Sequence, residues 1–225
     1  MILRGTLETG GELFGDLLSL RPQCERLRAG AFVLRGFAVA ESAEILEELV
    51  GILARAPLRH MTTPGGFRMS VAMSNCGALG WVTDRSGYRY TPVDPESGRP
   101  WPPMPEVFTS LATQAAKRVG YEEFVPDACL INRYEPGARL TLHQDRNERD
   151  FAQPVVSVSL GLPAVFQFGG LLRADRTVRV PLEHADVVVW GRESRLSFHG
   201  VLPLGQGRHP ATGECRINLT FRHAG

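Results

Sequence analysis

Short apolar stretches follow one another at even spacing from about residue 126 to residue 222, and they leave few folds open. Glycine, proline or charged residues separate each stretch from the next. Such stretches predict short β-strands joined by turns, and eight in succession favour a β-sandwich or barrel. The eight predicted strands are ACLINRY, RLTLHQD, PVVSVSLG, AVFQFGG, TVRVPLE, DVVVWG, LSFHGVL and CRINLTFR.

The first half of the chain has a different pattern. Residues 42–55 repeat apolar side chains at helical spacing, and residues 105–119 predict a second helix with proline in its first turn. Residues 61–90 mix glycine, methionine and aromatic residues without a clean period. Residues 91–105 contain six prolines, which indicates a rigid, irregular connection.

Length and composition fit a single α+β protein. The chain has 225 residues, of which 43% are hydrophobic and 22% charged, as in an ordinary globular protein. We predict that residues 1–105 form a helical and irregular N-terminal extension and that residues 106–225 contain the β-strand core. The two parts are expected to pack as one compact unit.

Several classes of protein are disfavoured by the same numbers. No apolar run approaches the roughly 20 residues of a membrane helix, and the N-terminus lacks the pattern of a signal peptide. We therefore expect no membrane partner. The four cysteines occur singly, which indicates reduced thiols and a cytoplasmic protein. Because the net charge is only +1, a polyanionic partner would need a local basic patch.

Three residues have the side chains of a metal site. Alternation along RLTLHQD places His143 and Asp145 on one face, and His199 follows a strand pattern near the end of the β region. Two histidines and one carboxylate form a facial triad that suits Fe(II) and leaves three positions open. The same ligands could hold zinc with an activated water, and a lone His-x-Asp is also common at the edge of a loop.

The last predicted strand places a row of polar side chains on one face, which either meets solvent or lines an internal site. Its arginines could pair bidentately with the two ends of a dicarboxylate, and polar residues of LINRY could add hydrogen bonds. A dicarboxylate beside an Fe(II) triad indicates 2-oxoglutarate. The residues concerned are Arg216, Asn218, Thr220 and Arg222 on the last strand, and Asn132 and Tyr134 on LINRY.

Four segments together resemble the AlkB family of nucleic-acid demethylases. They are GGFRMSVAMSNCGALGW, ACLINRYEPGARLTLHQD, SRLSFHG and RINLTFR. The resemblance covers most of the chain and is weakest in the first thirty residues. The fold it implies is a double-stranded β-helix, or jelly roll, with N-terminal helices and a nucleotide-recognition lid.

The resemblance also implies roles for the residues named above. His143, Asp145 and His199 would hold the iron. Arg216 would pair with the distal carboxylate of 2-oxoglutarate and Arg222 with the end near the metal, and the supporting residues would be Asn132, Tyr134 and Asn218.

The implied activity is oxidative demethylation of bases such as 1-methyladenine and 3-methylcytosine. It would consume O₂ and 2-oxoglutarate and release succinate and formaldehyde. The implied substrate is alkylated single- or double-stranded DNA, with RNA as a second candidate, and we expect the protein to act as a monomer.

A base stacked in a duplex cannot reach a buried iron, so the target base must be flipped out or unpaired. By the resemblance, Met73, Trp81 and Tyr88 would clamp the base, although Met73 and Trp81 could instead serve packing. Candidates for phosphate contacts are Arg85, Arg89, Arg139 and Arg173, each of which could instead be a solvated surface charge.

One position departs from the family pattern. Close bacterial relatives carry an aspartate two residues beyond the metal-binding aspartate, placed to accept a hydrogen bond from an exocyclic amine. This chain has Asn147 there, followed by Glu148 as a further candidate substrate contact. Because an asparagine amide donates as well as accepts, we predict more tolerance for bases that present a carbonyl.

Other readings remain open from the sequence. An Fe(II)/2-oxoglutarate hydroxylase of a protein or small molecule would keep the triad and the arginines without needing the aromatic lid residues. A non-catalytic nucleic-acid binder could dispense with a metal ligand, and a zinc hydrolase has no use for both arginines. The remaining histidines are expected to be surface or structural residues: His60, His184, His209 and His223.

Overall fold

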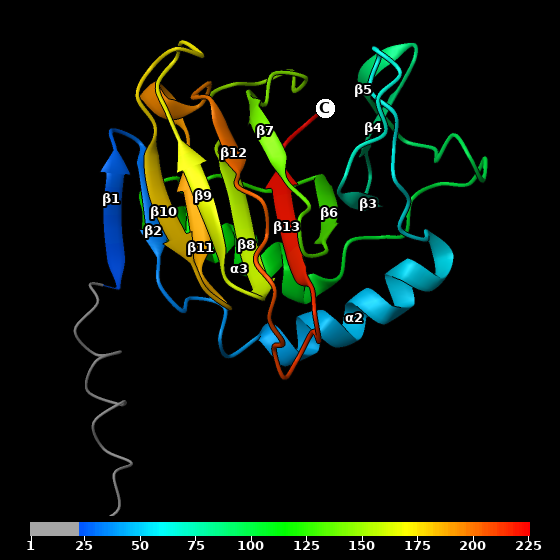
Figure 1. Cartoon of the computed structure of the whole chain (residues 1–225), viewed down its shortest axis with the longest axis horizontal. Helices are drawn as coiled ribbons and strands as arrows, with labels where there is room; N and C mark the ends of the chain where they lie inside the picture. Colours follow the sequence, from blue (N-terminus) through cyan, green and yellow to red (C-terminus); the bar gives the residue numbers. More distant parts are fainter. Residues whose placement is uncertain (1–22) are drawn as a thin grey trace, which may run out of the picture.

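A computed structural model describes residues 23–225, and two β-sheets packed against each other dominate it (Figure 1). The larger sheet has the strand order β1-β2-β11-β8-β13-β6-β3 and the smaller has β10-β9-β12-β7. Neighbouring strands are antiparallel, and the order shows the crossovers of a jelly roll, as predicted. The strands of the larger sheet are β1 (Cys24–Arg28), β2 (Ala31–Leu34), β3 (Ala72–Gly77), β6 (Ala128–Tyr134), β8 (Val155–Gly161), β11 (Val187–Trp190) and β13 (Arg216–Arg222). Those of the smaller sheet are β7 (Leu140–His143), β9 (Ala164–Phe168), β10 (Val178–Leu182) and β12 (His199–Val201).

All eight strands predicted from the C-terminal half are present, and so are both helices, α2 (Ser42–Arg55) and α3 (Glu106–Arg118). The sequence did not predict β1, β2 and β3, nor the hairpin of β4 (Gly80–Asp84) and β5 (Gly87–Thr91). Because β1, β2 and β3 pair within the larger sheet, the first half of the chain helps to build the core as well as covering it.

Strand β13 lies near the middle of the larger sheet, and its apolar and polar side chains alternate between the two faces of that sheet. Its apolar side chains pack with α2 and α3 in one core cluster, where Phe221 meets the ring of Phe108 edge-on at 5.9 Å. Its polar side chains lie between the sheets rather than in solvent, since Arg216 is 1% exposed and Arg222 is 5% exposed. A second apolar cluster includes side chains from both sheets, among them Val155, Phe168 and Trp190.

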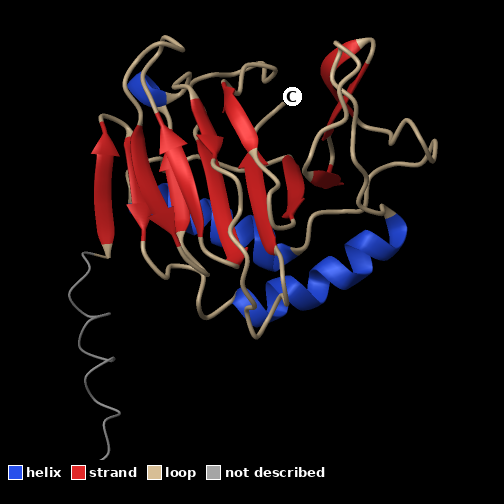
Figure 2. Ribbon diagram, viewed as in Figure 1, coloured by secondary structure: helices blue, strands red, loops and turns tan. Residues whose placement is uncertain are grey.

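The β4–β5 hairpin forms a small sheet of its own beside the end of the larger sheet (Figure 1). Both long helices lie outside the pair of sheets (Figure 2). Among the described residues, no helix is long and apolar enough to cross a membrane. The two sheets thus enclose the polar face of β13.

Candidate metal centre and its two cavities

Two paired strands bring the metal-ligand candidates together. His143 ends β7, His199 begins β12, and the two residues are partners in the ladder, with ring centroids 4.4 Å apart. Asp145 follows two residues after β7, and its carboxylate lies 3.9 Å and 3.8 Å from the Nε2 atoms of the histidines. The ligand atoms all lie within 4.8 Å of one another, and no other such group occurs among the described residues.

Backbone carbonyls orient both imidazole rings for a metal. Nδ1 of His143 lies 2.9 Å from the carbonyl of Thr141, and Nδ1 of His199 lies 3.0 Å from that of Ser197. A ring whose Nδ1–H donates to a carbonyl keeps the lone pair of Nε2 free, and these are the nitrogens that face Asp145. The donor set therefore fits a divalent metal such as Fe(II).

The protonation states also suit a metal. Burial opposes the ionisation of Asp145, but Arg222 donates to its Oδ2 from Nε at 3.0 Å and Nη2 at 2.7 Å. As a result the pKa of Asp145 lies well below its usual range. Burial, with His143 adjacent, lowers the pKa of His199 to about 4. A carboxylate and a neutral imidazole are the forms that bind metals.

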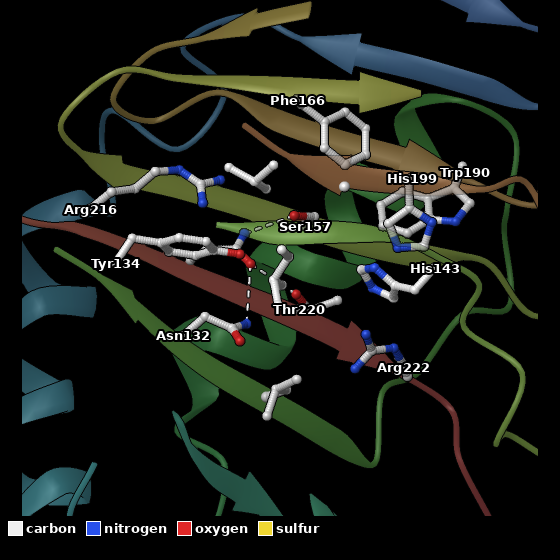
Figure 3. A pocket seen from close by; sticks show the side chains of 15 residues that line it. Asn132, Tyr134, His143, Ser157, Phe166, Trp190, His199, Arg216, Thr220 and Arg222 are labelled. Carbon is white, nitrogen blue, oxygen red and sulfur yellow. Dashed lines mark hydrogen bonds between the residues drawn. The ribbon is translucent and has the colours of Figure 1, made fainter. Parts of the chain in front are cut away.

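The inner cavity extends from the metal centre along the polar face of β13. Figure 3 shows Arg216 and Tyr134 at one end, and His143, His199 and Arg222 at the other. Its polar wall is a chain of side chains that hydrogen-bond to one another: Asn132, Ser157, Asn218 and Thr220.

Arg216 shows what the inner cavity can bind. It lies over the ring of Tyr134 at 5.0 Å and donates from Nη2 to Ser159 at 2.7 Å, but its Nε and Nη1 are buried without a partner. Burial lowers the pKa of Arg216 and raises that of Tyr134 to about 12. A buried guanidinium with two free nitrogens fits an anionic ligand, because burial without one is costly.

The outer cavity opens on the other side of the metal centre, with an empty volume of about 1440 Å³. The hairpin supplies Trp81 and Tyr88, whose rings stack with centroids 5.7 Å apart. The indole Nε1 of Trp81 donates to Oδ1 of Asn147 at 3.3 Å. Of the sequence-predicted substrate contacts, those that line this cavity are Met73, Trp81, Tyr88, Asn147 and Arg173.

Other predicted contacts lie elsewhere. The carboxylate of Glu148 is buried and bonded to Tyr90 and Arg195, so it does not line the cavity. Arg89 pairs with Asp84 within the hairpin at 2.7 Å. Two more predicted arginines, Arg85 and Arg139, also lie outside the cavity lining.

Sequence reasoning missed several residues of the site. Ser157 and Ser159 alternate along β8 and face the arginine and amide groups, so the spacing of PVVSVSLG could have placed them. Arg195 and Tyr90 carried no such signal, because their partner is far away in sequence. The further residues that line the two cavities are Thr63, Met69, Leu130, Leu140, Thr141, Gln144, Arg146, Phe166, Trp190, Phe198, Gly200 and Val201.

Comparisons with known proteins agree with this geometry. The family model of the 2OG-Fe(II) oxygenase superfamily matches residues 30–222. The chain is 56% identical over 214 residues to the "Alpha-ketoglutarate-dependent dioxygenase AlkB" of Escherichia coli (strain K12), covering 95% of this chain and 98% of that protein. It is 33% identical over 124 residues to the "Nucleic acid dioxygenase ALKBH1" of Homo sapiens, covering 55% and 31% of the two chains. A solved structure titled "The structure of OsALKBH1" superposes with a TM-score of 0.78 at 28% identity, covering 89% of this chain and 99% of that one.

Proposed function

The chain belongs to the AlkB family within the 2OG-Fe(II) oxygenase superfamily, and on that premise we propose that it removes alkyl groups from the ring nitrogens of nucleic-acid bases. It is an Fe(II)- and 2-oxoglutarate-dependent dioxygenase. We propose 1-methyladenine and 3-methylcytosine as substrates, in DNA and also in RNA. We further propose that it acts as a monomer in the cytoplasm, where its free cysteines would stay reduced.

One observation carries the proposal: Arg216 lies buried with two unpartnered nitrogens at one end of a cavity whose other end is the His-Asp-His centre. His143, Asp145 and His199 would hold the iron. When Fe(II), 2-oxoglutarate and O₂ are bound, they supply the oxidation that yields succinate, CO₂ and a hydroxylated methyl group, which leaves the base as formaldehyde.

The chain's own residues bind and orient the reactants. Arg216 binds the distal carboxylate of 2-oxoglutarate, and the ring of Tyr134 packs against the face of that guanidinium. Arg222 holds Asp145 in its ionised form and lies where the other end of the co-substrate must approach the metal. The amides of Asn132 and Asn218 line the cavity between the two arginines.

The outer cavity is suited to a flat base. Trp81 and Tyr88 form an aromatic wall, and His143 belongs to both cavities, so a base held there lies next to the metal centre. Arg173 on the cavity wall could pair with a phosphate of the same strand. Such a base must be unpaired or flipped out of a duplex.

The test is anaerobic reconstitution with Fe(II) and 2-oxoglutarate, followed by exposure to air with a single-stranded oligonucleotide that carries 1-methyladenine. We expect the oligonucleotide to lose the mass of one CH₂ unit, because hydrogen replaces the methyl group, only when 2-oxoglutarate is present and not with His143→Ala. Decarboxylation without loss of the methyl group would point to a protein or small-molecule substrate. Neither reaction, with iron bound, would point to a non-catalytic nucleic-acid binder.

A further inference from the structure

The β4–β5 hairpin carries Trp81 and Tyr88, yet it belongs to neither main sheet. In the part of the chain that the structure describes, its two strands pair with each other and with no third strand. A two-stranded hairpin is only marginally stable by itself in water. The contacts between the hairpin and the core therefore decide where its aromatic side chains stand over the outer cavity.

Tyr90 connects the hairpin with the segment that follows Asp145. It is the ladder partner of Trp81, so the two side chains share one face of the hairpin. Its hydroxyl donates to Oε1 of Glu148 at 2.6 Å, a short distance typical of a hydroxyl bonded to a carboxylate. Burial raises the pKa of Tyr90 well above its usual value, so the hydroxyl keeps the proton that it donates.

The acceptor is itself fixed inside the protein. The side chain of Glu148 is 2% exposed, and its Oε2 accepts from Nη2 of Arg195 at 3.0 Å. Nε of Arg222 lies 3.5 Å from Oε1. The other nitrogens of Arg195 donate to the backbone carbonyls of Asp145 and Gln153, both at 2.8 Å. Two carboxylates thus face two guanidiniums, which is the balance a buried charge cluster requires.

We propose that the Tyr90–Glu148 hydrogen bond is a positioning link that fixes the hairpin relative to the metal centre. One end moves with the aromatic wall of the outer cavity, and the other end is bonded through Arg195 to the backbone of Asp145. The link sets the distance between the Trp81 indole and the metal, and so directs oxidation to the base held between them. This inference rests on the proposed function, because it assigns the hairpin a base to position.

The geometry separates this role from a direct contact with substrate. Both carboxylate oxygens of Glu148 already have partners within the protein, and the residue does not line the outer cavity. The hairpin has a second hydrogen bond to the same segment, from the indole of Trp81 to Asn147 at 3.3 Å, but Asn147 is exposed. The Tyr90–Glu148 bond is shorter and ends on a buried carboxylate.

The test variant is Tyr90→Phe, which removes one hydroxyl and keeps the ring. We expect KM for the methylated oligonucleotide to rise about tenfold, as expected for a lost hydrogen bond to a charged group. KM for 2-oxoglutarate should stay unchanged, and the ratio of succinate formed to formaldehyde released should rise. The matched control is Tyr121→Phe, whose hydroxyl donates to the carbonyl of Gly30 at 2.9 Å, away from both cavities.

A second measurement does not depend on catalysis. In the metal-free protein, hydrogen exchange of the backbone amides of residues 80–91 should be faster in Tyr90→Phe than in the wild type. The Tyr121→Phe control should leave exchange in this segment unchanged. This comparison still works if a variant proves too weak an enzyme for kinetic study.

The outcomes separate the two proposals. The link is supported if Tyr90→Phe shows faster hydrogen exchange in the hairpin, a higher KM for the oligonucleotide and a higher ratio of succinate to formaldehyde. Hairpin exchange in Tyr90→Phe that equals that of the wild type overturns it. Where the wild type demethylates, an oligonucleotide KM and a succinate-to-formaldehyde ratio that are unchanged in Tyr90→Phe also overturn it. If the wild type does not demethylate, the proposed function fails, and the exchange comparison alone decides whether the bond fixes the hairpin.

Discussion

At the scale of single residues, Asn147 shows how one neighbour can set the chemistry of an amide. The indole N–H of Trp81 can only donate, so it turns Oδ1 of Asn147 toward itself. The amide NH₂ is then the group that can donate to a ligand in the outer cavity, which Asn147 lines. A donor at this position suits a base edge with a carbonyl, whereas an aspartate there would only accept.

We therefore expect the wild type to act on 3-methylthymine as well as on 1-methyladenine. In Asn147→Asp, the rate ratio of 1-methyladenine to 3-methylthymine should rise about tenfold, because the carbonyl base would face an unpaired acceptor. Competition assays with the two bases in otherwise identical oligonucleotides measure this ratio. Equal ratios for both proteins would contradict the prediction.

Arg216 illustrates a residue placed for binding at a cost in stability. Its guanidinium is buried with two nitrogens unpartnered. In Arg216→Met, the free energy of unfolding without ligand should rise by about 1 kcal/mol or more, because a poorly compensated buried charge is removed. The same variant should lose the rise in melting temperature that 2-oxoglutarate and a redox-inert metal give to the wild type.

Thermal unfolding with and without 2-oxoglutarate checks both halves of this prediction. A matched control is Arg133→Met, since Arg133 lies on the neighbouring strand and pairs with Glu135 at the surface at 3.3 Å. A ligand-free Arg216→Met protein that is clearly less stable than the wild type would contradict the argument. It would show that the guanidinium contributes to the fold through Ser159 and Tyr134.

At the scale of elements, the apolar side chains of β13 stabilise the fold, while its arginines line the cavity. Phe221 is fully buried and packs edge-on against Phe108 of α3. Phe221→Ala should lower the free energy of unfolding by about 3–5 kcal/mol, because it removes apolar contacts and leaves a cavity. Urea denaturation should show a lower midpoint, and Phe221→Leu should lose less. An Ala variant within about 0.5 kcal/mol of wild type would contradict the packing argument.

The elements also show which parts of the fold a sequence can predict. Strand β13 follows from alternation alone, because it has one apolar face toward the helices and one polar face toward the cavity. The hairpin strands β4 and β5 have no such pattern, since tertiary contacts such as that of Asn75 with the backbone of Trp81 hold them.

The site divides in the same way. The candidate metal ligands could be predicted because His143 ends one strand, Asp145 follows it by two residues and His199 begins another strand. Their chemistry also limits the choice. Glu148 was expected to contact substrate, but its surroundings come from residues distant in sequence, Tyr90 and Arg195. The local sequence around a carboxylate does not indicate which distant residues will hydrogen-bond to it in the folded protein.

At the scale of the whole molecule, the distribution of charge limits how nucleic acid can bind. The net charge is +1, and many described arginines are already paired: Arg35 with Glu25 and Asp186, Arg59 with Asp94, Arg89 with Asp84, Arg195 with Glu148 and Arg222 with Asp145. Arg146 and Arg173 line the outer cavity, and neither forms an ion pair with an acidic side chain among the described residues. The wall of the outer cavity therefore offers two arginines to a phosphate backbone.

This distribution predicts a weak dependence of binding on salt. For a single strand, the slope of log K against log salt concentration is about −0.7 for each phosphate neutralised. With Arg146 and Arg173 as the contacts, the slope should be about −1.4, and Arg173→Ala should reduce it by about half. Titration of a labelled single strand over a range of NaCl concentrations measures it. A slope as steep as about −4 would mean that the strand follows a much wider basic surface, and the outer cavity would then supply only part of the binding site.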